Sequence, residues 1–234
     1  MNSFIRDKIK TILNHIKLLS LELVIVLAAF FTSAYLVVFL IRKVFVHQEE
    51  SFDKDVFSFF NQHISPALTN FMQFFTLFGS HYFLVPANLL LIAYSLFIKK
   101  DSWFTIKTTA VAFSSLILMF SLKRLFNRTR PLEPLLKEVN GLSFPSGHAF
   151  MSFTFFGLLI FMVYIRTKNI ALKVGLISFF LWMSFIVGIS RIYLRVHYAT
   201  DVLAGFAMGV IWLTLSLGVL HMIEKNKTKL PSVQ

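Results

Sequence analysis

Six long apolar stretches separated by polar connections form the main pattern of the chain. They cover residues 18–41, 67–98, 103–122, 147–165, 171–189 and 199–223. About 20 apolar residues in a helix span the hydrocarbon core of a bilayer, so each stretch predicts one membrane-spanning helix. The second stretch is interrupted at residues 79–81 and at Pro86, and we expect one tilted or kinked helix with an interfacial lead-in. The predicted fold class is therefore all-α, an integral membrane bundle of six helices.

The polar segments predict the ends and connections of this bundle. Residues 1–17 and 224–234 are polar and basic, and the apolar run after residue 17 is too long for the core of a removed signal peptide. In the acidic connection 42–66, apolar side chains recur at helical spacing, namely Phe52, Val56, Phe57, Phe60 and Ile64. This predicts a short amphipathic helix on the membrane surface. It serves either to bring lipid to a site or, as we favour, as a plain connector.

Composition supports the membrane class and excludes others. Of the 234 residues, 56% are hydrophobic, and the mean hydropathy is +0.72. No polar stretch is long enough for a soluble domain, so residues 1–234 are interpreted as a single membrane domain. The net charge of +12 does not indicate nucleic-acid binding, because the basic residues lie in short connections beside membrane headgroups. The absence of cysteine excludes disulfide and thiolate chemistry.

The distribution of charge predicts an orientation. Six spans place both termini on one side, which carries thirteen of the 23 Lys and Arg residues, against ten on the other side. Three of those ten, Lys123, Arg130 and Arg191, are candidate ligand-binding residues that are considered below. Without them, seven remain on that side. The positive-inside rule then places the termini in the cytoplasm and the connections 42–66, 123–146 and 190–198 outside.

Three polar clusters fall on that second side. They are Lys123 with Arg130-Pro131, then Pro145-Ser146-Gly147-His148, and then Ser190-Arg191 with His197 and Asp201. Each cluster alone has a plain explanation, such as headgroup binding, an ordinary helix start, or a polar contact between residues four apart. Ionisable groups next to membrane spans are costly, however, and together they indicate a functional site.

The three clusters together suit a phosphoryl group. Lys123, Arg130 and Arg191 supply positive charge and forked donors. Ser146 and Gly147 offer a hydroxyl and free backbone N–H groups at a positive helix end. The two histidines supply an acid and a nucleophile near neutral pH, and Asp201 lies one helical turn from His197.

The motifs Lys-x6-Arg-Pro, Pro-Ser-Gly-His and Ser-Arg-x5-His-x3-Asp occur in this order between residues 123 and 201. They resemble the three signature motifs of the type 2 phosphatidic acid phosphatase (PAP2) superfamily, in its membrane lipid phosphatase branch, which includes bacterial phosphatidylglycerophosphatases and undecaprenyl pyrophosphate phosphatases. All the specified positions are present.

The resemblance implies a role for each matching residue. His197 would attack phosphorus and become phosphohistidine, Asp201 would orient His197, and His148 would protonate the leaving oxygen and then activate water. The phosphoryl oxygens would be bound by the remaining motif residues, which are Lys123, Arg130, Ser146, Gly147 and Arg191. The resemblance implies no metal and no cofactor.

The predicted activity is hydrolysis of a lipid phosphate or pyrophosphate in the bilayer. The expected substrates are undecaprenyl pyrophosphate or phosphatidylglycerophosphate, followed by phosphatidic acid, and the expected location is the bacterial inner membrane. A lipid phosphotransferase would use the same motifs. A transporter is disfavoured because the ionisable residues cluster at one face, and a haloperoxidase because of the six spans. Gly205 and Gly209 predict close helix packing within one bundle, and the oligomeric state is left open.

Overall fold

The computed structural model describes residues 3–131, 134–136 and 141–227, and six of its helices are long and apolar enough to cross a membrane. The elements, in order, are α1 (Ser3–Ile41), η1 (Arg42–Val46), α2 (Ser51–Asn61), α3 (Pro66–Thr76), η2 (Leu77–Gly79), α4 (His81–Ala93), η3 (Tyr94–Ile98), α5 (Ser102–Phe126), α6 (Gly147–Arg166), α7 (Ile170–Tyr193) and α8 (Ala199–Lys227). The predicted all-α membrane fold is confirmed.

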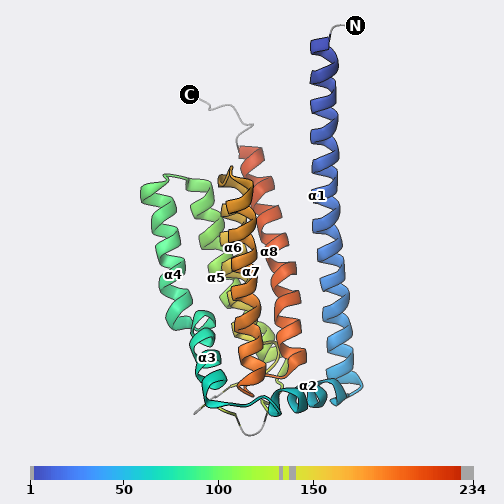
Figure 1. Cartoon of the computed structure of the whole chain (residues 1–234), viewed down its shortest axis with the longest axis vertical. Helices are drawn as coiled ribbons and strands as arrows, with labels where there is room; N and C mark the ends of the chain where they lie inside the picture. Colours follow the sequence, from blue (N-terminus) through green and yellow to red (C-terminus); the bar gives the residue numbers. More distant parts are fainter. Residues whose placement is uncertain (1–2, 132–133, 137–140, 228–234) are drawn as a thin grey trace.

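Figure 1 shows both termini at one end of the bundle and α2 lying across the other end. The predicted helix in the 42–66 connection is therefore present. Helix α1 begins at Ser3 and extends beyond the rest of the bundle, so the basic residues 3–17 are helical, while the spanning part starts at Leu21. Most of the basic C-terminal tail, from residue 228 on, lies outside the described residues.

The second apolar stretch, residues 67–98, forms a separate helix α3, which corresponds to the expected lead-in, followed by the spanning part. Helix α3 and the short η2 turn end at Gly79, and α4 starts afresh at His81 after the extended residue Ser80. The spanning part is residues 81–98. Gly79 is required at the break, because a Cβ there would lie 2.4 Å from Cγ1 of Val187 and 3.0 Å from Cδ2 of His148.

Helix α6 is the centre of the bundle and packs against α7 and α8. The α8 backbone comes close to α6 at two glycines. A Cβ on Gly205 would lie 2.8 Å from the carbonyl oxygen of Ser146, and one on Gly209 would lie 2.9 Å from Cδ1 of Phe153. The small-residue motif therefore packs inside one bundle, as predicted.

Candidate active site

The three motif clusters meet where α5, α6, α7 and α8 end or begin, at the end of the bundle that α2 covers. Lys123 lies in the last turn of α5 and Arg191 in the last turn of α7. Ser146 is the N-cap of α6, and its backbone N–H donates to the carbonyl of Asp201 in the first turn of α8, at 3.0 Å. This bond joins the start of the second motif to the end of the third.

His197 lies in the tight turn between α7 and α8. The turn is held by backbone N–H groups of Val196 and His197, which both donate to the carbonyl of Arg191. The ring is 1% exposed, and burial lowers the pKa of His197 to about 3. The imidazole is therefore neutral at physiological pH, which is the form required of a nucleophile.

Asp201 lies beside one ring nitrogen of His197. Nδ1 of His197 is 3.5 Å from Oδ2 of Asp201, longer than an ordinary hydrogen bond, and 3.4 Å from Oγ of Ser143. The same Oδ2 accepts from the Ser143 hydroxyl and, at 2.9 Å, from the backbone N–H of Tyr198. The carboxylate is thus fixed on the Nδ1 side, so that Nε2 of His197 is left for a substrate.

Two cations of the first motif are held by main-chain carbonyls. Nζ of Lys123 donates to the carbonyl of Leu142 at 2.6 Å. Arg130 donates from Nε to Gly141 and from Nη1 to Val196, at 3.0 and 2.9 Å. Within the described residues neither cation forms an ion pair, and burial lowers the pKa of Arg130. Among the described residues, no carboxylate therefore forms an ion pair with either cation.

Arg191 is the third cation, and it is 4% exposed. Its Nη1 donates to Oγ1 of Thr76 at 2.6 Å. Its Nε is buried and has no hydrogen-bond partner among the described residues. A buried donor without an acceptor is costly, and a phosphoryl oxygen would satisfy it.

His148 is the second residue of α6, and the charges of Lys123, Arg130 and Arg191 all act on it. Its ring lies against Gly79 at the break between α3 and α4. A bulkier residue there would displace the imidazole. The structure therefore brings all eight predicted site residues to one end of the bundle.

A groove leads from this site along α4 and α5. Lys123, Gly147 and His148 line one end of it, and the rest is mostly apolar. Its volume is about 420 Å³. Several apolar lining residues face outward, with Leu89 61% and Phe113 66% exposed, so the groove opens toward the hydrocarbon of the membrane.

The described part of the chain contains no group of three or more His, Cys, Asp or Glu residues that could hold a metal ion. Lys123, Arg130 and Arg191 would also repel a divalent cation. The side chains present suit a phosphate anion.

The family comparison agrees with this geometry. The family model of the PAP2 superfamily matches residues 104–225, more than half of the chain. The chain belongs to this superfamily.

Related PAP2 proteins cover most of the chain. Phosphatidylglycerophosphatase B of Bacillus subtilis (strain 168) is 29% identical over 172 residues, which are 70% of this chain and 81% of that protein. The crystal structure of the transmembrane PAP2-type phosphatidylglycerolphosphate phosphatase from Bacillus subtilis matches 83% of this chain and 96% of its own, with a TM-score of 0.72 and 25% identity. That of Aquifex aeolicus LpxE matches 70% and 93%, with a TM-score of 0.54 and 30% identity. The predicted membrane lipid phosphatase is confirmed.

Sequence reasoning missed several residues at this PAP2 site. Ser143 and Arg128 both bond to Asp201, and Arg128 also pairs with Asp53 of α2. Thr76 holds Arg191, and Gly79 lies against His148. The interruption at residues 79–81 was the one sequence signal near these positions. Helix α2 is also more than the plain connector that we favoured, because Asp53 is buried beside the site.

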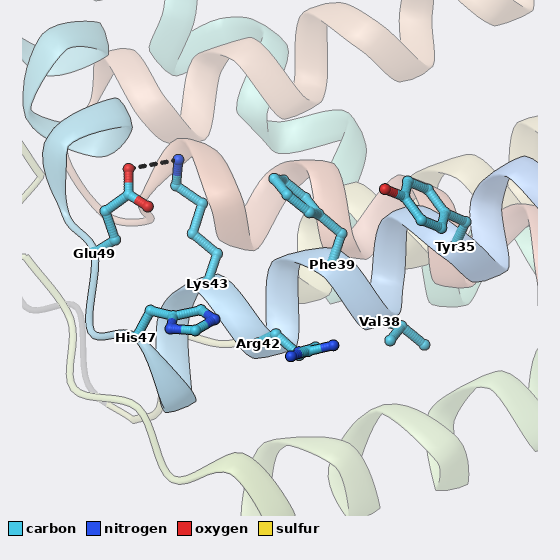
Figure 2. A pocket seen from close by; sticks show the side chains of 7 residues that line it. All are labelled: Tyr35, Val38, Phe39, Arg42, Lys43, His47 and Glu49. Carbon is cyan, nitrogen blue, oxygen red and sulfur yellow. Dashed lines mark ion pairs between the residues drawn. The ribbon is translucent and has the colours of Figure 1, made fainter.

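A second hollow, of about 240 Å³, lies on α1 and η1, away from these site residues. Figure 2 shows apolar and aromatic side chains of α1 at one end of it and Arg42, Lys43 and His47 at the other, with Lys43 paired to Glu49 at 3.0 Å. Basic side chains at the end of a spanning helix are typical of the headgroup layer, and none of the residues that line this hollow belongs to the site.

Proposed function

We propose that this PAP2 enzyme removes a terminal phosphate from a membrane lipid, with His197 as nucleophile. One observation carries the proposal. Three cations, Lys123, Arg130 and Arg191, form no ion pair with any described residue and surround the His197–Asp201 pair where an apolar groove begins. The phosphate would bind the cations while the hydrocarbon chain lies in the groove between α4 and α5.

In the first step, Nε2 of His197 attacks phosphorus and the bond from phosphorus to the leaving oxygen breaks. His148 gives that oxygen its proton, and Asp201 stabilises the positive imidazole through Nδ1–H. In the second step, His148 takes a proton from water, and the resulting hydroxide attacks phosphohistidine. Inorganic phosphate leaves and His197 regains its neutral ring.

The cations would bind the charge that spreads over the phosphoryl oxygens in both transition states. Arg191 offers its Nε, which has no hydrogen-bond partner in the described part of the chain. Gly147 and the α6 N-terminus add backbone N–H donors. A Cβ at Gly147 would lie 3.6 Å from Cε of Lys123, an ordinary contact, so the glycine is not required by packing alone.

Substrate choice is tested by phosphate release from phosphatidylglycerophosphate, undecaprenyl pyrophosphate and phosphatidic acid, in detergent and in vesicles. We expect phosphatidylglycerophosphate or undecaprenyl pyrophosphate to have the highest kcat/KM. Product analysis with an added acceptor lipid separates hydrolysis from phosphotransfer. If no lipid phosphate releases phosphate, the proposal is wrong.

The groove is tested by filling it. Ala112 lines the groove, and Ala112→Trp should raise KM for a long-chain lipid phosphate while leaving a short-chain, water-soluble ester unaffected. Leu125→Trp is the matched control, because Leu125 lies on the same helix, is 73% exposed and does not line the groove. If Ala112→Trp affected both substrates equally, the groove would not be the binding site of the hydrocarbon chain.

We further propose that the site faces outward from a bacterial inner membrane, with the termini in the cytoplasm. The excess of basic residues on the terminal side supports this orientation. Because the chain has no cysteine, single cysteines report topology cleanly. Ser58→Cys on α2 should react with an impermeant thiol reagent in intact cells, and Asn226→Cys only after lysis. The reverse pattern would place the chemistry in the cytoplasm.

A further inference from the structure

The guanidinium of Arg128 joins two carboxylates from distant parts of the chain. Its Nη1 donates to Oδ1 of Asp201 at 2.6 Å, and its Nη2 donates to Oδ2 of Asp53 at 3.0 Å. Asp53 lies in α2 and is 2% exposed, and Asp201 lies in α8 and is fully buried. Arg128 itself lies in the connection after α5. Three elements therefore meet at one side chain.

Thr200 closes this arrangement into a ring. Asp53 accepts from the Thr200 backbone N–H at 2.9 Å and from its hydroxyl at 2.7 Å. Nη1 of Arg128 lies 2.8 Å from the same hydroxyl oxygen. The guanidinium also lies 4.0 Å from the ring centre of Tyr198, which borders His197. Protein groups thus contact both terminal nitrogens of the Arg128 guanidinium, and an aromatic ring lies over it.

Arg128 differs in charge balance from the three cations at the phosphate site. Burial would lower the pKa of Arg128, but the carboxylates of Asp201 and Asp53 outweigh burial and raise it. Its charge is matched by two carboxylates, so it has little to offer a phosphate. Among its contacts, the one with Asp201 leads to the reacting atoms, because Asp201 lies beside Nδ1 of His197.

The two carboxylate oxygens of Asp201 have different partners. Arg128 occupies Oδ1. Oδ2 remains for Ser143, the N–H of Tyr198 and Nδ1 of His197. Arg128 therefore fixes the rotation of the carboxylate, and Asp53 fixes Arg128. Without them the carboxylate could turn away from Nδ1, which is already 3.5 Å distant.

We propose that Arg128 is a positioning residue for Asp201, and that Asp53 holds it there so that the surface helix α2 sets the geometry of the nucleophile. The inference rests on the proposed function of His197. Asp53 is the buried residue of α2, and the apolar face of that helix packs at the start of α8, with the ring of Phe57 5.7 Å from that of Tyr198. The helix is thereby docked on the site by both apolar and ionic contacts.

The test uses Asp53→Asn, Arg128→Lys and Arg128→Gln in the full-length enzyme, with kcat, KM and the rate of phosphoenzyme formation as readouts. A displaced catalytic group typically costs about 10²-fold, so we expect Asp53→Asn and Arg128→Gln to lower kcat by roughly 10- to 100-fold with KM changed less than about twofold. Arg128→Lys keeps the charge but cannot bridge both carboxylates, and should recover only part of the rate. Asp55→Asn is the matched control, an exposed carboxylate on the same helix.

Asp53→Asn combined with Arg128→Gln should be no slower than Arg128→Gln alone, because both act through one network. A rise in KM at unchanged kcat would make Arg128 a phosphate ligand, and additive losses or wild-type rates would also overturn the proposal. If Arg128→Gln does not fold, the kinetics of Asp53→Asn alone test the proposal, since this variant retains the Arg128–Asp201 pair.

The failure of this inference can be distinguished from the failure of the proposed function. If the wild-type enzyme forms no phosphoenzyme, the proposed function is wrong. If wild type and variants form phosphoenzyme at equal rates, only this inference is wrong.

Discussion

The two ends of the α5–α8 bundle both bury charge, but they do so differently. At the end near the termini, Nζ of Lys107 lies 2.6 Å from Oε2 of Glu224, and Lys107 is 7% exposed. At the other end, Lys123, Arg130 and Arg191 have no ion-pair partner within the described residues. A matched pair stabilises the helices that carry it, whereas an excess of one sign marks a binding site for the opposite charge.

The sharpest test of this difference exchanges one cation at each end. Arg191→Gln should lower kcat/KM by roughly 10²- to 10³-fold, the usual cost of one donor to developing charge. Lys107→Met should leave kcat/KM unchanged and lower thermal stability, because it leaves Glu224 without its partner. Steady-state assays and thermal unfolding in the same detergent measure both. Equal kinetic losses would mean that unpaired charge does not distinguish the two ends.

A smaller effect is expected from steric pressure on the acid–base histidine. In Gly79→Ala the new Cβ would press on Val187 and on the ring of His148, so we expect kcat to fall by about 10-fold. Adding Val187→Ala removes the first clash and should leave the kinetic loss in place. Gly175→Ala is the control, because a Cβ there meets nothing within 4 Å. Full recovery of kcat in the double variant would assign the effect to packing alone.

The pH dependence should also be small. Because burial holds the pKa of His197 at about 3, lowering the pH from 7 to 5 leaves its ring neutral. The rate of phosphoenzyme formation should then change less than about twofold on account of this group. An unshifted histidine with a pKa near 6.5 would instead lose roughly 25-fold, because its neutral fraction would fall from about 76% at pH 7 to about 3% at pH 5. Rapid-quench rates at saturating substrate distinguish these cases.

The smallest effect is expected from metal removal. Chelation should leave activity within about twofold, because the described residues offer no ligand cluster and three cations line the site. Orthovanadate, which mimics five-coordinate phosphorus, should inhibit. Loss of activity with chelator and its return with Mg²⁺ would contradict the proposed chemistry.

The six spans and the eight motif residues could be predicted from the sequence because both signals are local. Apolar length predicts a span, and fixed spacing between polar residues predicts a site. The break at Gly79 was visible as an interruption but not as the position on which His148 rests. The role of Gly79 depends on the packing of α3 against α7, which cannot be predicted from the spacing of residues along the sequence.

Asp53 could not be predicted as a site residue for the same reason. It lies among four acidic residues in a polar connection, where one buried carboxylate is indistinguishable from exposed neighbours. Arg128 likewise lies within the first motif at a position that the motif leaves open. Both can be recognised only in the folded chain, where Nη2 of Arg128 lies 3.0 Å from Oδ2 of Asp53, a residue 75 positions away in the sequence.

The central claim, that His197 carries the phosphoryl group, is tested most directly by trapping it. Rapid quench of the enzyme with a lipid phosphate labelled in its terminal phosphate should yield acid-labile phosphohistidine, mapped to His197 by peptide analysis. His148→Ala should bind substrate but turn over at least about 10²-fold more slowly, and His197→Ala should form no phosphoenzyme. A fully active His197→Ala enzyme, or label on another residue, would contradict the account.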